Sequence, residues 1–172
     1  MAGNASKGFT LMEMVIVLTM LAIMAAVAGP YLSNGMRAYN DSASAVHTLS
    51  KLRLASERLV REIREIRGDG AGNYDITLPL SAGALEFFKS DGERVSINGA
   101  GAQLTLTYAS IAGGAPFTLS DQLSSVTFSY LTSAGMPYTS IADLGIIEFE
   151  LVLTHAGNEY RQRSRVALRN QP

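Results

Sequence analysis

The 172-residue sequence predicts an α+β fold in which one long N-terminal helix precedes an antiparallel β-sheet. Three observations predict it. An apolar run near the N-terminus carries no charge between Met14 and Ala28. Apolar residues at helical spacing then continue to Ile66. After Gly72 the pattern changes to short strand-like segments separated by turn residues.

The first predicted element is an apolar helix over residues 9–32. At about 1.5 Å per residue it is long enough to cross a hydrocarbon core of about 30 Å. Basic residues flank it on both sides, Lys7 and Arg37, so flanking charge does not decide its orientation. Glu13 is unusual in such an apolar helix, because a charge within a membrane costs roughly 2.5–3.5 kcal/mol or more.

The second predicted element is an amphipathic helix over residues 33–67, continuous with the first. Its apolar stripe is spaced by threes and fours and consists of Leu32, Met36, Tyr39, Ala43, Val46, Leu49, Leu52, Ser56, Leu59, Ile63 and Ile66. The glycine-rich residues 68–72 end the pattern. Gly29-Pro30 interrupts the long helix, because proline lacks an N–H and clashes with the preceding turn. We expect a kink, either a bend or local unwinding, between Gly29 and Gly35.

Residues 68–172 are predicted to form the antiparallel sheet, one face of which the amphipathic helix covers. The expected strands are residues 85–89, 94–97, 103–110, 126–132, 146–154 and 159–169. Asn98-Gly99 predicts a turn, residues 112–116 predict a loop, and His155-Ala156-Gly157-Asn158 predicts a closing hairpin. In residues 126–132, Val126, Phe128 and Tyr130 share one face.

Composition excludes several kinds of site. The chain has no cysteine, so it has no disulfide or thiolate metal site. A net charge of −1 gives no general reason to expect a nucleic-acid partner. His47 and His155 lack the neighbours of a catalytic or metal-binding residue. We therefore predict a protein that is not an enzyme and needs no cofactor or metal.

Two charged groups have alternative interpretations. The late helix is basic, with Glu57, Glu62 and Glu65 interleaved at i,i+4 spacing, which predicts a solvated or subunit-facing surface. Arg161, Arg163, Arg165 and Arg169 share one strand face, which fits a polar sheet face, a subunit interface or a DNA contact. The polar face or interface is favoured, because no base-stacking aromatics interleave with the arginines.

Calcium binding is the remaining possibility for the acidic residues. Asp121, Asp143 and Glu148 could contribute to such a site, but their spacing matches no calcium loop. Helix caps or surface acids are the favoured interpretation.

The stretch Lys7-Gly8-Phe9-Thr10-Leu11-Met12-Glu13 resembles the processing site of type IV pilins and type II secretion pseudopilins. The resemblance implies that residues 1–8 are a leader peptide, which prepilin peptidase removes between Gly8 and Phe9. It also implies N-methylation of Phe9. Glu13 becomes the fifth residue of the mature chain, and Pro30 falls where many members carry a proline.

Cleavage also accounts for the charge of Glu13. The new ammonium on Phe9 lies four residues before Glu13, on the same helix face. In a filament packed through these helices, Glu13 can pair with the Phe9 ammonium of a neighbouring subunit, so that only the correct register leaves no charge unpaired. The alternative is a glutamate that snorkels to the membrane edge.

Residues 55–64 and 165–170 resemble minor pilins and J-class minor pseudopilins. The resemblance implies a filament subunit anchored in the inner membrane by a single span, with a periplasmic C-terminal domain. Its partners would be prepilin peptidase, other pilins or pseudopilins and the inner-membrane assembly platform. The alternatives are a secreted binding domain, cut after Ala28 by ordinary signal peptidase, and a DNA-uptake pilin that uses the C-terminal arginines. The sequence leaves open whether the machine serves secretion, adhesion, motility or DNA uptake.

Overall fold

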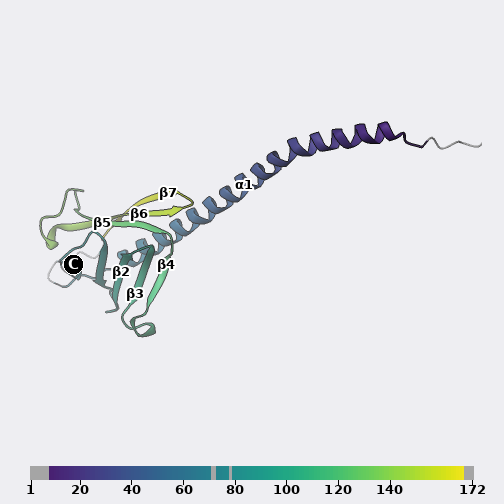
Figure 1. The fold of residues 1–172 in the computed structure, drawn as a ribbon. Coiled ribbons are helices and arrows are strands. Elements are labelled where there is room, and N and C mark those ends of the chain that lie inside the picture. Colours follow the sequence, from purple (N-terminus) through teal and green to yellow (C-terminus); the bar gives the residue numbers. More distant parts are fainter. Residues whose placement is uncertain (1–7, 71–72, 78, 169–172) are drawn as a thin grey trace, which may run out of the picture. The chain divides into compact units, whose positions relative to one another are not determined.

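A computed structural model describes residues 8–70, 73–77 and 79–168 of the chain. The chain divides into an N-terminal unit, residues 1–43, and a C-terminal unit, residues 44–172, and each is considered by itself. A single helix, α1 (Leu11–Arg64), contributes to both. Figure 1 shows the order of elements, with the strands following the helix. The predicted α+β fold, a long helix packed on antiparallel sheet, is confirmed.

In the N-terminal unit, α1 remains helical through Gly29, Pro30 and Gly35. Of the two expected outcomes at this point, local unwinding is therefore wrong, and the bend stays a prediction. Thr19 is the one clearly polar side chain of the charge-free run. Its hydroxyl donates to the carbonyls of Ile16 and Val15, at 2.8 and 3.0 Å, so the polar group is satisfied within the helix.

The C-terminal unit contains two antiparallel sheets where the sequence predicted one. The first has the order β1 (Ala84–Phe88), β2 (Arg94–Ala100), β3 (Gln103–Tyr108) and β4 (Pro116–Ser120). The second has the order β5 (Leu123–Thr132), β6 (Leu144–His155) and β7 (Asn158–Ala167). Short 3₁₀ turns, η1 (Ala112–Gly114) and η2 (Ile141–Asp143), lie in the connections before β4 and β6.

Two hairpin predictions have opposite outcomes. The closing hairpin is confirmed, since His155 pairs with Asn158 around a two-residue turn. The turn at Asn98-Gly99 is wrong, because β2 continues through both residues and the chain reverses after Ala100. Gly99 instead allows a close approach between the sheets, since a Cβ there would lie 2.3 Å from Val126 Cγ1. The strand β4 has no counterpart among the strands predicted from the sequence.

The helix ends at Arg64, three residues before the predicted end at residue 67. The helix ends there because the next backbone N–H groups form other hydrogen bonds. The Ile66 N–H bonds the Ile63 carbonyl in a tightened last turn, and the Arg67 N–H then bonds the Phe88 carbonyl at 3.0 Å. Ile66 itself forms a β-bridge with Lys89, the residue directly after β1.

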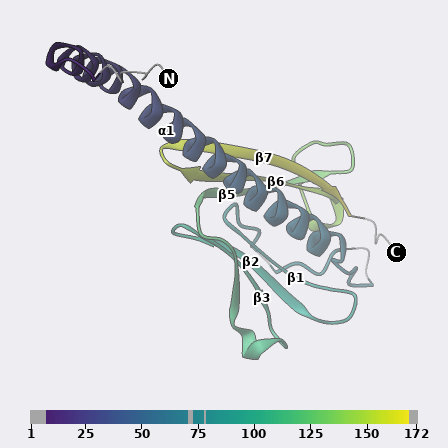
Figure 2. The same cartoon turned by 90° about the vertical axis from the view of Figure 1, so that its right-hand side faces the viewer.

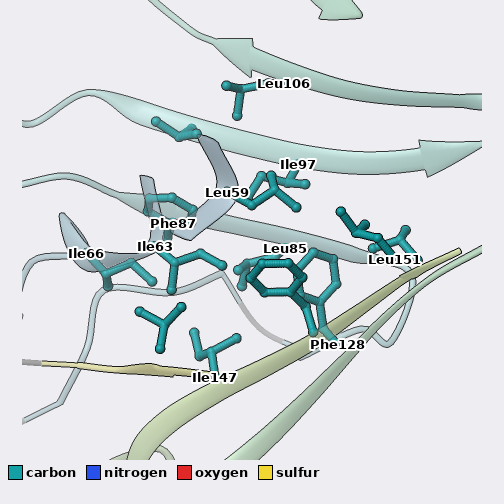
Figure 3. Close-up of a cluster of buried hydrophobic side chains, with 14 of the residues drawn as sticks. Leu59, Ile63, Ile66, Leu85, Phe87, Ile97, Leu106, Phe128, Ile147 and Leu151 are labelled. Carbon is teal, nitrogen blue, oxygen red and sulfur yellow. The ribbon is translucent and has the colours of Figure 1, made fainter. Parts of the chain in front are cut away.

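One hydrophobic core joins α1 to both sheets. Leu59 and Ile63 of α1 meet Phe87 of the first sheet and Ile147 of the second, and all four are fully buried (Figure 3). Val126, Phe128 and Tyr130 of β5 are buried on one face, as their alternation predicted. In Figure 2 the last turns of α1 lie across the strands of the C-terminal unit.

Candidate functional site

The predicted cleavage site is exposed and lies outside regular structure. Gly8 and Phe9 precede the first turn of α1, and Phe9 is 76% exposed. Nothing lies within 4 Å of where a Cβ on Gly8 would stand. An exposed, non-helical bond is the kind of backbone that a peptidase can reach. Lys7 and the rest of the predicted leader before Gly8 lie outside the described residues.

Thr10 caps the helix that begins directly after this bond. Its carbonyl accepts the first helical bond, from the Met14 N–H at 3.2 Å, and its hydroxyl accepts from the Glu13 N–H at 3.2 Å. Thr10 and Glu13 thus occupy the first and last positions of a capping-box sequence, Thr-x-x-Glu. This cap was not predicted, although the Thr-x-x-Glu spacing before an apolar run was the signal for it. A carboxylate in the first turn also suits the helix dipole.

The first turns of α1 present apolar side chains all around. Between Phe9 and Leu32 every residue is exposed. The large apolar side chains among them are Phe9, Leu11, Met12, Met14, Val15, Ile16, Val17, Leu18, Met20, Leu21, Ile23, Met24, Val27, Tyr31 and Leu32. Among the described residues, α1 is the one helix long and apolar enough to cross a membrane by length and composition. Exposed apolar surface on this scale marks a membrane or a protein interface.

The predicted apolar stripe of α1 divides into two parts. In the C-terminal unit its members Leu52, Leu59 and Ile63 are buried in the core. In the N-terminal unit Leu32, Met36 and Tyr39 are exposed, and with Gly35 they line a shallow groove of about 510 Å³. From Leu52 onward the periodic pattern therefore supplies the core of the domain, whereas its members up to Leu49 are exposed.

Glu62 corrects the interpretation of the late helix as a solvated charged surface. It is 2% exposed and accepts a hydrogen bond from the Tyr108 hydroxyl at 2.8 Å. Its charge is balanced by Arg58 Nη2 at 3.0 Å and by Lys89 Nζ at 3.3 Å. Lys89 also pairs with Glu65 at 2.6 Å. We call these five residues the Glu62 cluster.

The Glu62 cluster holds Lys89 charged. Burial opposes the ammonium, but the hydrogen bond that Lys89 donates to Glu65 and the charges of Glu62 and Glu65 outweigh it and raise the pKa of Lys89. Burial and the hydrogen bond to Glu62 also raise the pKa of the Tyr108 hydroxyl. The cluster ties α1 to β3 and to the end of β1, which is a structural role.

The arginine face of β7 is charge-balanced by acidic residues. Arg165 and Arg163 both pair with Glu148 of β6, Arg163 at 3.0 Å, and Arg161 pairs with Glu159 at 2.6 Å and Glu150 at 3.7 Å. Glu148 is 4% exposed. Three arginines facing three glutamates give no net positive surface, which weighs against a DNA contact. Arg169, the fourth predicted member, lies outside the described residues.

The structure does not bring the possible calcium ligands together. Asp121 binds Lys51 Nζ at 2.7 Å, Asp143 accepts from Thr139 and Ser140 at its helical turn, and Glu148 pairs with arginines. No group of three metal-binding side chains occurs within residues 8–70, 73–77 and 79–168. Asp121 and Glu148 are ion-pair partners, and Asp143 accepts hydrogen bonds from two neighbouring hydroxyl groups.

A family model describes residues 3–29 as a prokaryotic N-terminal methylation motif. The chain carries the pilin methylation motif. This motif belongs to the type IV pilin and pseudopilin superfamily, whose members are structural subunits and not enzymes, and it implies processing by prepilin peptidase and assembly with other pilins. Together with the exposed apolar helix it is consistent with anchoring in the inner membrane before assembly. Comparison with curated proteins gives no match.

Proposed function

We propose that the chain is a minor pilin or minor pseudopilin, a structural subunit of a type IV pilus-like or type II secretion filament. Prepilin peptidase cuts between Gly8 and Phe9, Phe9 is N-methylated, and residues 9–32 anchor the subunit in the inner membrane with its C-terminal domain in the periplasm. The subunit then enters the filament from the assembly platform through its N-terminal helix. The minor subclass follows the resemblance of residues 55–64 and 165–170 noted above.

The observation that carries the proposal is the start of α1. Helical structure begins at Leu11, immediately after an exposed Gly8-Phe9 bond, and continues without a break past Ala28. A cut after Ala28 by signal peptidase would fall in the middle of that helix. A cut at Gly8 leaves Phe9 and the Thr10 cap as the mature N-terminus and keeps the whole apolar helix with the domain.

A substitution at Glu13 tests this mode of assembly. Its side chain is exposed, and among the described residues no cation pairs with its carboxylate. In an apolar filament interior that charge needs a partner, and the methylated ammonium of Phe9 on a neighbouring subunit supplies one. Breaking a buried pair by removing one charge costs roughly 3–5 kcal/mol.

The experiment compares Glu13→Gln with the wild type in cells that build the filament. Glutamine keeps the size of the side chain and removes its charge. Mass spectrometry should find both chains beginning at N-methyl-Phe9, because the cut lies four residues away, while recovery of Glu13→Gln in sheared filaments should fall sharply. Asp41→Asn, an exposed acid of the same unit, is the matched control and should assemble normally.

Two results would contradict the proposal. A mature chain that begins at Gly29 would establish ordinary secretion of a soluble domain. Normal processing with wild-type incorporation of Glu13→Gln would reduce Glu13 to a snorkelling residue at the membrane edge.

A further inference from the structure

The outer edge of β7 is an open sheet edge. The second sheet has the order β5-β6-β7, and within the described part of the chain no strand pairs with the far side of β7. Unpaired edge strands present a row of free N–H and C=O groups that can receive another strand. At ten residues, β7 is long enough for several such bonds.

The other sheet edges are occupied or short. Residues 75–77 bond to β1, with the Thr77 N–H on the Glu86 carbonyl at 2.8 Å and the Phe88 N–H on the Asp75 carbonyl at 2.9 Å. The Phe128 N–H of β5 bonds the Ala82 carbonyl at 2.7 Å. The strand β4 has five residues and begins with Pro116, which has no N–H to offer.

The register identifies which backbone groups of β7 point outward. The Leu168 N–H bonds the Gly145 carbonyl at 2.9 Å, so this pair is hydrogen-bonded. Pairing alternates along an antiparallel ladder, so Val166, Ser164 and Gln162 also bond β6. The backbone groups of Arg165, Arg163 and Arg161 therefore point to the free edge. The ion pairs agree, because side chains lie closest in non-hydrogen-bonded pairs, and Arg165 stands opposite Glu148.

A groove lies beside the same strand. It has a volume of about 630 Å³ and is bounded by Val60, Arg61 and Arg64 of α1 and by Gln162 and Ser164 on the inner face of β7. Ser164 is tied to α1 through Ser56, with 3.0 Å between the hydroxyl oxygens. Figure 2 shows β7 running beside α1 in the C-terminal unit. A strand added to the edge would lie about 4.8 Å from β7 and could place alternate side chains in this groove.

We propose that the outer edge of β7 is a strand-addition site for an extended segment of another filament subunit. The proposal rests on the proposed function for the identity of the partner class. Only an extended backbone presents donors and acceptors that match those of Arg161, Arg163 and Arg165, which recur every two residues. Partner side chains facing the groove are small or aliphatic, to pack on Val60. Those on the opposite face are carboxylates or hydroxyls, which the exposed guanidinium groups can bind.

The arginines also select the partner. Each of the three is 62–64% exposed at its side chain and keeps donors beyond its glutamate pairing. Charged side chains on an edge strand discourage indiscriminate pairing, since an incoming apolar or basic strand would leave them poorly solvated or repelled. The site therefore favours one class of strand over general aggregation.

The test separates the backbone N–H of residue 163 from its side chain. Arg163→Ala removes the guanidinium and keeps the outward N–H, whereas Arg163→Pro removes both and leaves the ladder to β6 intact. Both full-length variants are produced in cells that build the filament. Their folding is compared by thermal unfolding in detergent, and their recovery is measured in sheared filaments. In parallel, a benzophenone amino acid at position 163 is photo-crosslinked, with position 127, on the same sheet face but on β5 at the opposite side of the sheet, as control.

We expect Arg163→Ala to assemble within about twofold of the wild type and Arg163→Pro at least tenfold less, with crosslinks to another subunit from position 163 and not from 127. Equal recovery of the proline and alanine variants, or equal crosslinking from both positions, overturns strand addition. If Arg163→Pro does not fold, the crosslinking comparison decides. Processing at Phe9 is scored in the same samples. A chain not cut at Gly8 overturns the proposed function, whereas a cut chain without edge crosslinks overturns only the strand-addition site.

Discussion

Glu62→Gln is the substitution that best tests how the C-terminal domain is held together. Glutamine keeps the volume of the side chain and can still accept the hydrogen bond from Tyr108, but it removes the buried negative charge. Lys89, whose side chain is 15% exposed, then loses one of its two carboxylate partners. We expect the domain to be destabilised while its fold is kept.

The magnitude follows from the geometry. A charge pair at the 3.3 Å that separates Glu62 from Lys89 is worth about 5 kcal/mol at an effective dielectric constant of about 20. Two effects reduce the loss. Glu65 remains 2.6 Å from Lys89, and the neutral amide has a smaller desolvation cost than the carboxylate. A net loss of about 2–3 kcal/mol is expected, or roughly 6–12 °C in Tm for a domain of this size.

The assay is thermal unfolding of the full chain in detergent, followed by near-ultraviolet circular dichroism of its tyrosines. Glu65→Gln is the matched control, because its side chain is 47% exposed, and it should cost less than about 1 kcal/mol. The double variant Glu62→Gln with Lys89→Met should recover part of the loss, since both charges of the buried pair are then removed and Glu65, which loses Lys89, is 47% exposed. A Glu62→Gln variant no less stable than Glu65→Gln would refute the buried-pair reasoning.

Three further predictions concern the same domain. Ala156 has φ +50° in the closing hairpin, so Ala156→Asn should raise stability by about 0.5–1 kcal/mol in thermal unfolding, because asparagine tolerates this conformation. Gly99→Ala should lower stability by about 1–3 kcal/mol in the same assay, because the new methyl group would overlap Val126. The pKa values of Lys89 and Tyr108 are raised by folding, so their contribution is complete below about pH 10 and is lost as the pH rises further. Unfolding midpoints at pH 8 and 11 should show this loss, and Tyr108→Phe should reduce it.

The sequence predicted the helix and most strands because their signals are local. Periodicity places Leu52, Leu59 and Ile63 on the buried face, and alternation does the same for Val126 and Phe128. The residues that sequence reasoning misassigned depend on distant contacts. The dipeptide Asn98-Gly99 is typical of a tight turn. The structure instead places Gly99 within β2, where β5 approaches it closely. The division into two sheets likewise depends on how strands far apart in sequence meet.

The residues of the candidate site likewise divide into those predicted from local signals and those that depend on distant contacts. Gly8, Phe9 and Glu13 were predicted because a short motif defines them, and the cap by Thr10 was available from the same spacing. The open edge of β7 could not be predicted. The alternation of its arginines indicates a strand, but only the sheet order shows that no described strand follows it. The sequence also could not show that Glu62 is buried, because Glu57, at similar spacing on the same helix, pairs with Arg53 at the surface.

Two of the carboxylates on α1, those of Glu62 and Glu13, lie in different electrostatic surroundings. Glu62 lies in apolar surroundings, and the chain supplies its counter-charges from Arg58 and Lys89. Glu13 lies in the most apolar part of α1, yet within the described residues no cation meets it. Glu13 is exposed in the described structure, so its carboxylate needs a counter-charge only when assembly removes it from water. The proposed cleavage at Gly8 would create an ammonium on Phe9 of every subunit. Under the proposed function, packing of α1 in a filament would remove Glu13 from water, and the Phe9 ammonium of a neighbouring subunit would be its counter-charge.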